Sequence, residues 1–187
     1  MSKKVCFITR NFGKYDPDSL KSYESIGGFT ALRKALKMDS NEIADVLAAN
    51  GVQGRGGAAY DMGKKWRQAR EVKGAHKCVV CNADEGEPGT FKDRELLTND
   101  PYQLLEGMII AGWSVGADNG YIYMREEYSH LRPRLLSAIA QGRVAAASVN
   151  IVAKNPNDWS KGMVLCIIVE FYAILSLLIS FLMIMFG

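Results

Sequence analysis

A glycine-rich segment with fixed positive charge lies near the middle of the 187-residue chain. It reads Gly54-Arg55-Gly56-Gly57, and Lys65 follows eight residues later. Closely spaced backbone N–H groups, together with a guanidinium or ammonium group, can face the same small anion. The segment therefore predicts a phosphate-binding loop, although a plain turn with solvated charge has the same composition.

An apolar, strand-like run from Cys78 to Cys81 stops abruptly in a polar segment that Pro88 and Gly89 force into a loop. Open α/β sheets bind ligands at the carboxyl ends of their strands. An acidic loop alone is usually only a solvated loop, but here it follows the glycine segment closely. The combination favours a ligand site, whose candidate residues are Asn82, Asp84, Glu85, Gly86 and Glu87.

The Cys78-x-x-Cys81 spacing occurs in metal and redox sites. Residues three apart in a strand point to opposite faces of the sheet, so a shared metal ligand is not expected. We interpret the two thiols as buried and structural. With two histidines and two further cysteines in the chain, no metal site is expected within it.

Composition and charge narrow the class of protein. The chain is 48% hydrophobic and 23% charged, and its formal net charge is only +3. Basic residues alternate with acidic ones, which argues against a nucleic-acid surface. The first residues lack the long apolar core of a secretory signal, so we expect the main domain to remain in the cytoplasm.

Helical and strand periodicities alternate along the first 141 residues and predict an α/β fold with a mostly parallel sheet covered on both faces. Asp39 is a predicted helix N-cap, Asn99 or Asp100 is predicted to cap the helix that starts at Pro101, and Met108 and Trp113 are expected in the core. Besides the run at 78–81, the pattern predicts strands at 4–10 and 121–125 and helices at 29–37, 40–49, 101–115 and 129–141.

The carboxyl-terminal part has a different composition. Residues 142–162 read as a linker, and 163–186 form an apolar run with Glu170 as the one charged side chain. At about 1.5 Å per residue, this run is long enough to cross a bilayer core of about 30 Å. We predict a transmembrane helix there. The positive-inside tendency places its amino-terminal side in the cytoplasm, so residues 163–186 would anchor a cytoplasmic domain in the cytoplasmic membrane.

From Arg10 to about Gln141 the chain resembles the flavin-carrying, NADH-binding subunit of respiratory complex I. It also resembles the diaphorase subunits of NAD-linked hydrogenases and formate dehydrogenases. In that family the glycine segment reads Gly-Arg-Gly-Gly-Ala-Gly-Phe-Pro-Thr-Gly, with a Trp that corresponds to Trp66, and Cys-Asn-Ala-Asp-Glu-(Gly/Ser)-Glu-Pro-Gly follows. The second pattern runs here from Cys81 to Gly89.

This resemblance implies a Rossmann-like domain that binds FMN, takes hydride from NADH and passes electrons to iron–sulfur clusters, which full-length relatives or partner subunits hold. Carried over to this sequence, the FMN phosphate and ring edge would contact Gly54, Arg55, Gly56, Gly57 and Lys65. The ribityl chain and the isoalloxazine would lie against Asn82, Asp84, Glu85 and Gly86. Glu87 would lie near the nicotinamide nucleotide.

The sequence also departs from the family pattern. Ala59-Tyr60-Asp61-Met62 replaces Gly-Phe-Pro-Thr, and Gln68 replaces an aromatic residue that stacks on adenine in many relatives. Past Gln141 no counterpart of the family's Tyr-Ile-Cys-Gly-Glu-Glu segment follows, so residues 1–141 are read as an incomplete FMN/NADH domain. Two interpretations stay open: a flavin subunit of an NADH:acceptor oxidoreductase complex, or a truncated, non-catalytic fragment tethered to the membrane.

Overall fold

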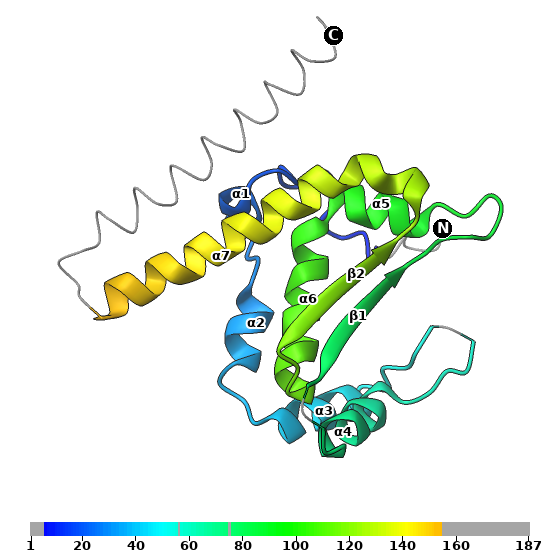
Figure 1. The fold of residues 1–187 in the computed structure, drawn as a ribbon, viewed down its shortest axis with the longest axis vertical. Helices are drawn as coiled ribbons and strands as arrows, with labels where there is room; N and C mark the ends of the chain where they lie inside the picture. Colours follow the sequence, from blue (N-terminus) through cyan, green and yellow to red (C-terminus); the bar gives the residue numbers. More distant parts are fainter. Residues whose placement is uncertain (1–5, 56, 75, 155–187) are drawn as a thin grey trace, which may run out of the picture. The chain divides into compact units, whose positions relative to one another are not determined.

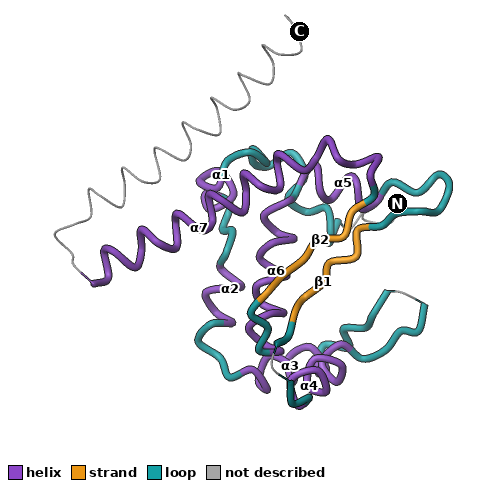
Figure 2. The backbone as a smooth tube through the Cα atoms, viewed as in Figure 1, coloured by secondary structure: helices purple, strands orange, loops and turns teal. Residues whose placement is uncertain are grey.

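The computed structural model of the protein describes residues 6–55, 57–74 and 76–154 (Figures 1 and 2). They form two compact units, one of residues 6–17 and 21–129 and the other of residues 18–20 and 130–154. The elements are α1 (Leu20–Ser25), α2 (Thr30–Ala35), α3 (Ser40–Ala49), α4 (Met62–Glu71), β1 (Cys78–Ala83), α5 (Lys92–Asn99), α6 (Pro101–Val115), β2 (Asn119–Met124), the 3-10 helix η1 (Glu126–Leu131) and α7 (Arg132–Lys154).

A parallel pair of strands, β1 and β2, forms the sheet of the first unit, with Val80 opposite Tyr121 and Asn82 opposite Tyr123. Parallel neighbours need a crossover connection, which α5 and α6 provide. Helix α6 lies along one face of this sheet (Figure 1). Gly112 of α6 faces β1 at contact distance, since a Cβ built on it would lie 3.8 Å from Val79 Cγ2. The predicted α/β class and the strand at 121–125 are therefore confirmed.

The other face of the sheet carries exposed side chains. Val80, Tyr121 and Tyr123 are 57%, 58% and 61% exposed, and all three stand on this face because strand side chains alternate. Parallel sheets are normally covered on both faces. The expectation of a sheet covered on both faces is thus met on one face only within the described part of the chain.

Helices α3 and α4 pack against each other and against α6. The predicted cap of α3 is confirmed: Asp39 accepts a hydrogen bond from the Asn41 N–H at 2.8 Å, and its own N–H donates to Glu42 at 2.9 Å. This capping box satisfies N–H groups that have no partner within the helix. Helix α4 was not predicted because it has few apolar residues, although Met62, Trp66 and Ala69 stand at helical spacing.

A cluster of tyrosines packs the chain's amino-terminal part against α6. Tyr15, Tyr23 and Tyr102 are buried, with the rings of Tyr23 and Tyr102 stacked 5.6 Å apart. The predicted strand at 4–10 is wrong for residues 7–10, which form turns. Phe7 and Ile8 are exposed, so the apolar run lacks the pairing and the burial that stabilise a strand.

In the second unit, residues 18–20 are tied to α7 by side-chain contacts. Arg134 binds both carboxylate oxygens of Asp18, at 2.6 and 2.9 Å, and Gln141 accepts from the Leu20 N–H at 3.0 Å. Helix α7 extends the predicted helix at 129–141 and runs on through residues 142–154, which the sequence pattern assigned to a linker. The remaining linker residues, 155–162, lie outside the described residues.

The predicted fold class needs correction in its membrane component. Within residues 6–55, 57–74 and 76–154, no helix is long and apolar enough to cross a membrane. The predicted span, 163–186, lies outside the residues that the structure describes. Apolar length had suggested a membrane helix there, whereas the longest described helix, α7, is 23 residues long but not apolar enough to cross a membrane.

Candidate functional site

The glycine segment forms a closed loop between α3 and α4. Its base is an isolated antiparallel bridge between Gln53 and Asp61, and the Gly54 N–H donates to the Tyr60 carbonyl at 2.8 Å. Above this base the side chain of Arg55 is exposed, and Gly57 has a φ of 96°. A Cβ added at Gly57 would meet nothing within 4 Å, so the glycine is required by the backbone conformation and not by a close contact.

Ala59 takes a left-handed conformation with a φ of 48°. At this position the family pattern has glycine, the residue for which that conformation carries no steric cost. The backbone of the loop therefore keeps a conformation suited to glycine although the sequence supplies alanine.

Helix α4 begins directly after the loop, and its N-terminus is capped from within the chain. Asp61 accepts a hydrogen bond from the Lys64 N–H at 2.7 Å. A helix N-terminus attracts anions, and here one carboxylate already stands there. Lys65, one turn into the helix, is exposed and can extend its ammonium group towards an anion at the loop.

The position that relatives fill with a stacking aromatic residue is Gln68, and its partner in this chain is an aromatic side chain. The Tyr60 hydroxyl donates to Gln68 Oε1 at 3.0 Å, and the Lys64 ammonium lies 5.9 Å from the centre of the Tyr60 ring. Tyr60 is 42% exposed. The glycine loop thus ends beside a partly exposed aromatic ring that is held in place by the first turns of α4.

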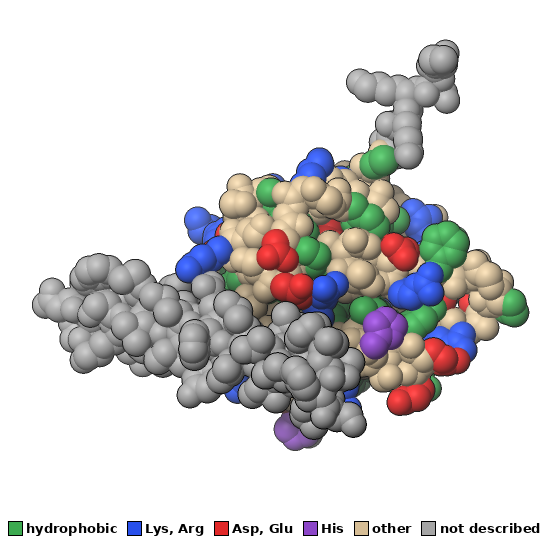
Figure 3. All heavy atoms as spheres, turned by 90° about the horizontal axis from the view of Figure 1, so that it is seen from above, with side chains coloured by type: hydrophobic (Ala, Val, Ile, Leu, Met, Phe, Trp, Pro, Cys, Tyr) green, Lys and Arg blue, Asp and Glu red, His purple; other side chains and the backbone are tan. Residues whose placement is uncertain are grey.

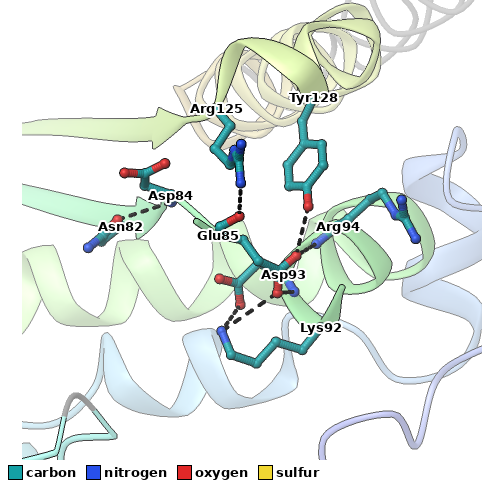
Figure 4. A network of polar contacts seen from close by, with 8 residues as sticks. All are labelled: Asn82, Asp84, Glu85, Lys92, Asp93, Arg94, Arg125 and Tyr128. Carbon is teal, nitrogen blue, oxygen red and sulfur yellow. Dashed lines mark hydrogen bonds and ion pairs between the residues drawn. The ribbon is translucent and has the colours of Figure 1, made fainter. Parts of the chain in front are cut away.

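At the carboxyl end of β1 most candidate residues point into solvent. Asn82, Asp84, Gly86 and Glu87 are exposed, and the Asp84 N–H donates to Asn82 Oδ1 at 3.0 Å, which shapes the chain as it leaves the strand (Figure 4). Such oxygens and amides can bind the hydroxyl groups of a ligand.

Glu85 differs from its neighbours because its side chain is fully buried. Its carboxylate accepts from the Asp93 N–H at 2.9 Å, from the Arg94 N–H at 3.3 Å and from the Tyr128 hydroxyl at 3.0 Å (Figure 4). The N-cap residue of α5, Phe91, makes no side-chain capping bond. Glu85 therefore caps α5 from outside the helix.

Electrostatics favours the ionised form of Glu85. Burial by itself raises the pKa of the carboxyl group, but the N–H groups of Asp93 and Arg94, the Tyr128 hydroxyl and the Lys92 ammonium together hold this pKa below its usual range. The Lys92 Nζ lies 3.8 Å from Glu85 Oε1. A buried carboxylate with this many donors is stable as a charge.

Two residues that follow β2 join this network, and the sequence analysis did not name them. Arg125 donates to the Glu85 carbonyl and pairs with Glu127, while Tyr128 of η1 binds the Glu85 carboxylate. The pattern did contain a signal for them. Because parallel strands end at the same edge of a sheet, the polar residues just after 121–125 could have been placed beside those after Cys81.

The two thiols lie on opposite faces of the sheet, as the alternation of strand side chains requires, but they are not both buried. Cys78 is exposed, and Cys81 is half-buried on the opposite face. Burial raises the pKa of the Cys81 thiol, with a further contribution from Asp93. The interpretation of Cys78 as a buried structural thiol is therefore wrong.

The predicted residues form two groups. The glycine loop and the acidic strand end project on the same side of the ribbon in Figure 1, and no hydrogen bond or ion pair among the described residues joins them. On the face that Figure 3 shows, basic and acidic side chains are interspersed, as they are along the sequence. The roles assigned to Gly54, Arg55, Gly57, Lys65, Asn82, Asp84, Gly86 and Glu87 stay predictions, and Gly56 lies outside the described residues.

The described elements define an α/β domain in which a glycine loop leads into a helix and a parallel strand ends in acidic residues. A family model described as the Nuo51 FMN-binding domain matches residues 47–168. The match covers more than half of the chain, which therefore belongs to this family. The resemblance predicted from the sequence is confirmed.

Individual relatives support the same family assignment. An NADH-quinone oxidoreductase subunit of Rhizobium meliloti is 42% identical over 135 residues, which are 72% of this chain and 32% of that protein. The NADP-reducing hydrogenase subunit HndC of Solidesulfovibrio fructosivorans is 41% identical over 75% of this chain and 29% of its own length. A crystal structure of an NAD+-reducing NiFe-hydrogenase in the air-oxidized state shares the fold with a TM-score of 0.56, at 36% identity over 72% of this chain and 22% of that one.

The chain spans about a third or less of the length of these relatives. The family description names FMN, and the names of the relatives carry NADH, NADP or NAD+. The cofactors expected from the sequence, FMN and NAD(H), are therefore confirmed for the family. The residue types at the glycine loop fit a phosphorylated flavin. The loop is uncrowded at Gly57, and the exposed Arg55 and Lys65 supply positive charge for a phosphate.

Proposed function

We propose that the chain is the FMN- and NADH-binding part of an NADH:acceptor oxidoreductase. Bound FMN would supply the redox chemistry, as an acceptor of hydride from NADH and a donor of single electrons. The observation that carries the proposal is the glycine loop, in which an open backbone with a φ of 96° at Gly57 stands between the exposed Arg55 and the first turn of α4.

The chain's own residues have distinct tasks in this proposal. The loop backbone at Gly57, with Arg55 and Lys65, binds the phosphate, while Gly54, whose N–H donates to the Tyr60 carbonyl, holds the loop closed beside it. Asn82 and Asp84 accept hydrogen bonds from ligand hydroxyl groups, and Glu87 orients the nicotinamide nucleotide. Iron–sulfur clusters of partner subunits would accept the electrons, which is consistent with relatives that are named as subunits of larger enzymes.

The test is a visible absorption spectrum of the purified full-length chain after incubation with FMN and gel filtration. We expect flavin to co-elute and to bleach when NADH is added. Arg55→Ala and Lys65→Ala should lose flavin, whereas Lys73→Ala, an exposed lysine after the end of α4, should retain it. Elution of the wild-type chain without flavin, or equal retention in all variants, would refute the assignment.

A further inference from the structure

We propose that Glu85 is a positioning residue, whose ionised carboxylate fixes the loop 84–89 between β1 and α5 and does not contact the ligand. This inference rests on the proposed function, and it separates Glu85 from the exposed residues beside it. It also makes Tyr128 and Arg125 part of the site's support.

The Glu85 carboxylate is not accessible to a ligand. The Glu85 side chain has no exposed surface, whereas Asp84 and Glu87 on either side are exposed. Each Glu85 carboxylate oxygen already has partners: Oε1 accepts from the Asp93 N–H, and Oε2 from the Arg94 N–H and the Tyr128 hydroxyl. A ligand would have to displace these bonds to reach the carboxylate.

Residue 85 is held in place at both its side chain and its backbone. Its carboxylate satisfies N–H groups of the first turn of α5, and its carbonyl accepts from Arg125. Arg125 is itself held by Glu127. Three segments thus meet at Glu85: the end of β1, the start of α5 and the chain that leaves β2 (Figure 4).

The buried Glu85, which anchors the loop, also determines which neighbouring carboxylates remain accessible. Consecutive residues of an extended chain point in opposite directions, so burying Glu85 turns Asp84 outward. The Asp84 side chain is exposed and interacts electrostatically with Arg125, so a ligand can reach its carboxylate. The anchor therefore sets which carboxylates of the loop face outward.

The experiment compares Glu85→Gln and Tyr128→Phe with Asp84→Asn in the full-length chain. Measurements are the Kd for FMN, the absorption spectrum of the bound flavin at saturating FMN, and amide hydrogen exchange at Asp93 and Arg94. A carboxamide accepts through one oxygen only, so Glu85→Gln leaves one of these two N–H groups without an acceptor. We expect it to raise the FMN Kd about tenfold or more and to speed that exchange, with an unchanged flavin spectrum. Tyr128→Phe should act in the same direction but more weakly, and should add little to Glu85→Gln.

Asp84→Asn should instead leave the amides of Asp93 and Arg94 protected and shift the flavin spectrum or the Kd. A changed flavin spectrum in Glu85→Gln with protected amides would mean that Glu85 contacts the flavin, and the proposal would be wrong. Unchanged exchange and unchanged Kd in both Glu85→Gln and Tyr128→Phe would also overturn it. If the wild-type chain binds no FMN, the proposed function fails, while the exchange data still decide whether Glu85 anchors the loop.

Discussion

Gly63 of α4 lies against the backbone of Ala44 in α3, so closely that a Cβ on Gly63 would come within 2.2 Å of the Ala44 carbonyl oxygen. The next nearest atoms are the N and Cβ of Ala48, at 2.8 and 3.0 Å. Backbone atoms cannot move aside as a flexible side chain can. The contact between the two helices that flank the glycine loop therefore depends on this one missing side chain.

Gly63→Ala should consequently destabilise the protein by about 1–3 kcal/mol, the usual range for overpacking. Urea unfolding followed by circular dichroism measures the loss. Gly107→Ala in α6 is the matched control, because a Cβ there meets nothing within 4 Å. The control should be neutral or stabilising by up to about 1 kcal/mol. Equal stability of Gly63→Ala and the wild-type chain would contradict the close approach.

Ala59→Gly should stabilise the loop. Alanine at a φ of 48° carries a left-handed strain of about 1–2 kcal/mol, which glycine removes at an entropic cost of about 0.4–1 kcal/mol in the unfolded chain. Thermal unfolding should show a small rise in Tm. Ala58→Gly, without a positive φ to relieve, should lower it. Both variants shifting Tm downward would argue against the strained conformation.

The charge of Asp61 should weaken anion binding at the glycine loop. Asp61→Asn keeps an oxygen that can cap α4 but removes the carboxylate charge beside the proposed phosphate site. Since an exposed charge interaction is worth up to about 1 kcal/mol, the FMN Kd should fall by up to about fivefold, and less at high salt. Riboflavin, which lacks the phosphate, is the control ligand, and its affinity should not change.

The ionisation of Glu85 predicts a pH dependence of stability. Its pKa in the folded protein is lower than the usual value of about 4.3 in an unfolded chain. A depressed carboxyl pKa stabilises the folded state above the unfolded pKa, and this contribution disappears as the pH falls through the folded pKa. Unfolding free energies measured from pH 7 down to pH 3 should therefore show the wild-type advantage over Glu85→Gln shrinking with acid. A difference that stays constant with pH would exclude an ionised Glu85 as its source.

Glu106 should be a strong determinant of stability in the amino-terminal part. Its carboxylate accepts from the Tyr23 hydroxyl at 2.7 Å and from the N–H groups of Phe29 and Leu32 at 3.0 and 2.9 Å. Glu106→Ala leaves the buried Tyr23 hydroxyl and two partly buried N–H groups without this acceptor, at about 1–3 kcal/mol for each group that water cannot reach. Chemical unfolding should show the loss. Glu95→Ala, on a more accessible face of α5, should cost much less.

Local sequence determined the parts of this protein that depend on neighbouring residues. The capping box at Asp39, the helix that starts at Pro101, the β-rich run at 121–125 and the two family motifs were all readable, because caps, periodicity and turn residues act within a few positions. The strand predicted from the apolar run at 4–10 was wrong for residues 7–10, because a strand needs a neighbouring strand to pair with and local sequence does not supply one.

Tertiary structure decided what the site residues do. Asn82, Asp84, Glu85 and Glu87 look alike in the sequence, yet only Glu85 is buried, because the first turn of α5 and Tyr128 meet it from segments 8 to 43 positions away. Arg125 and Tyr128 entered the site only because β1 and β2 are parallel and end at one edge. Which carboxylate faces a ligand and which anchors the loop is a property of distant contacts, and spacing along the chain does not contain it.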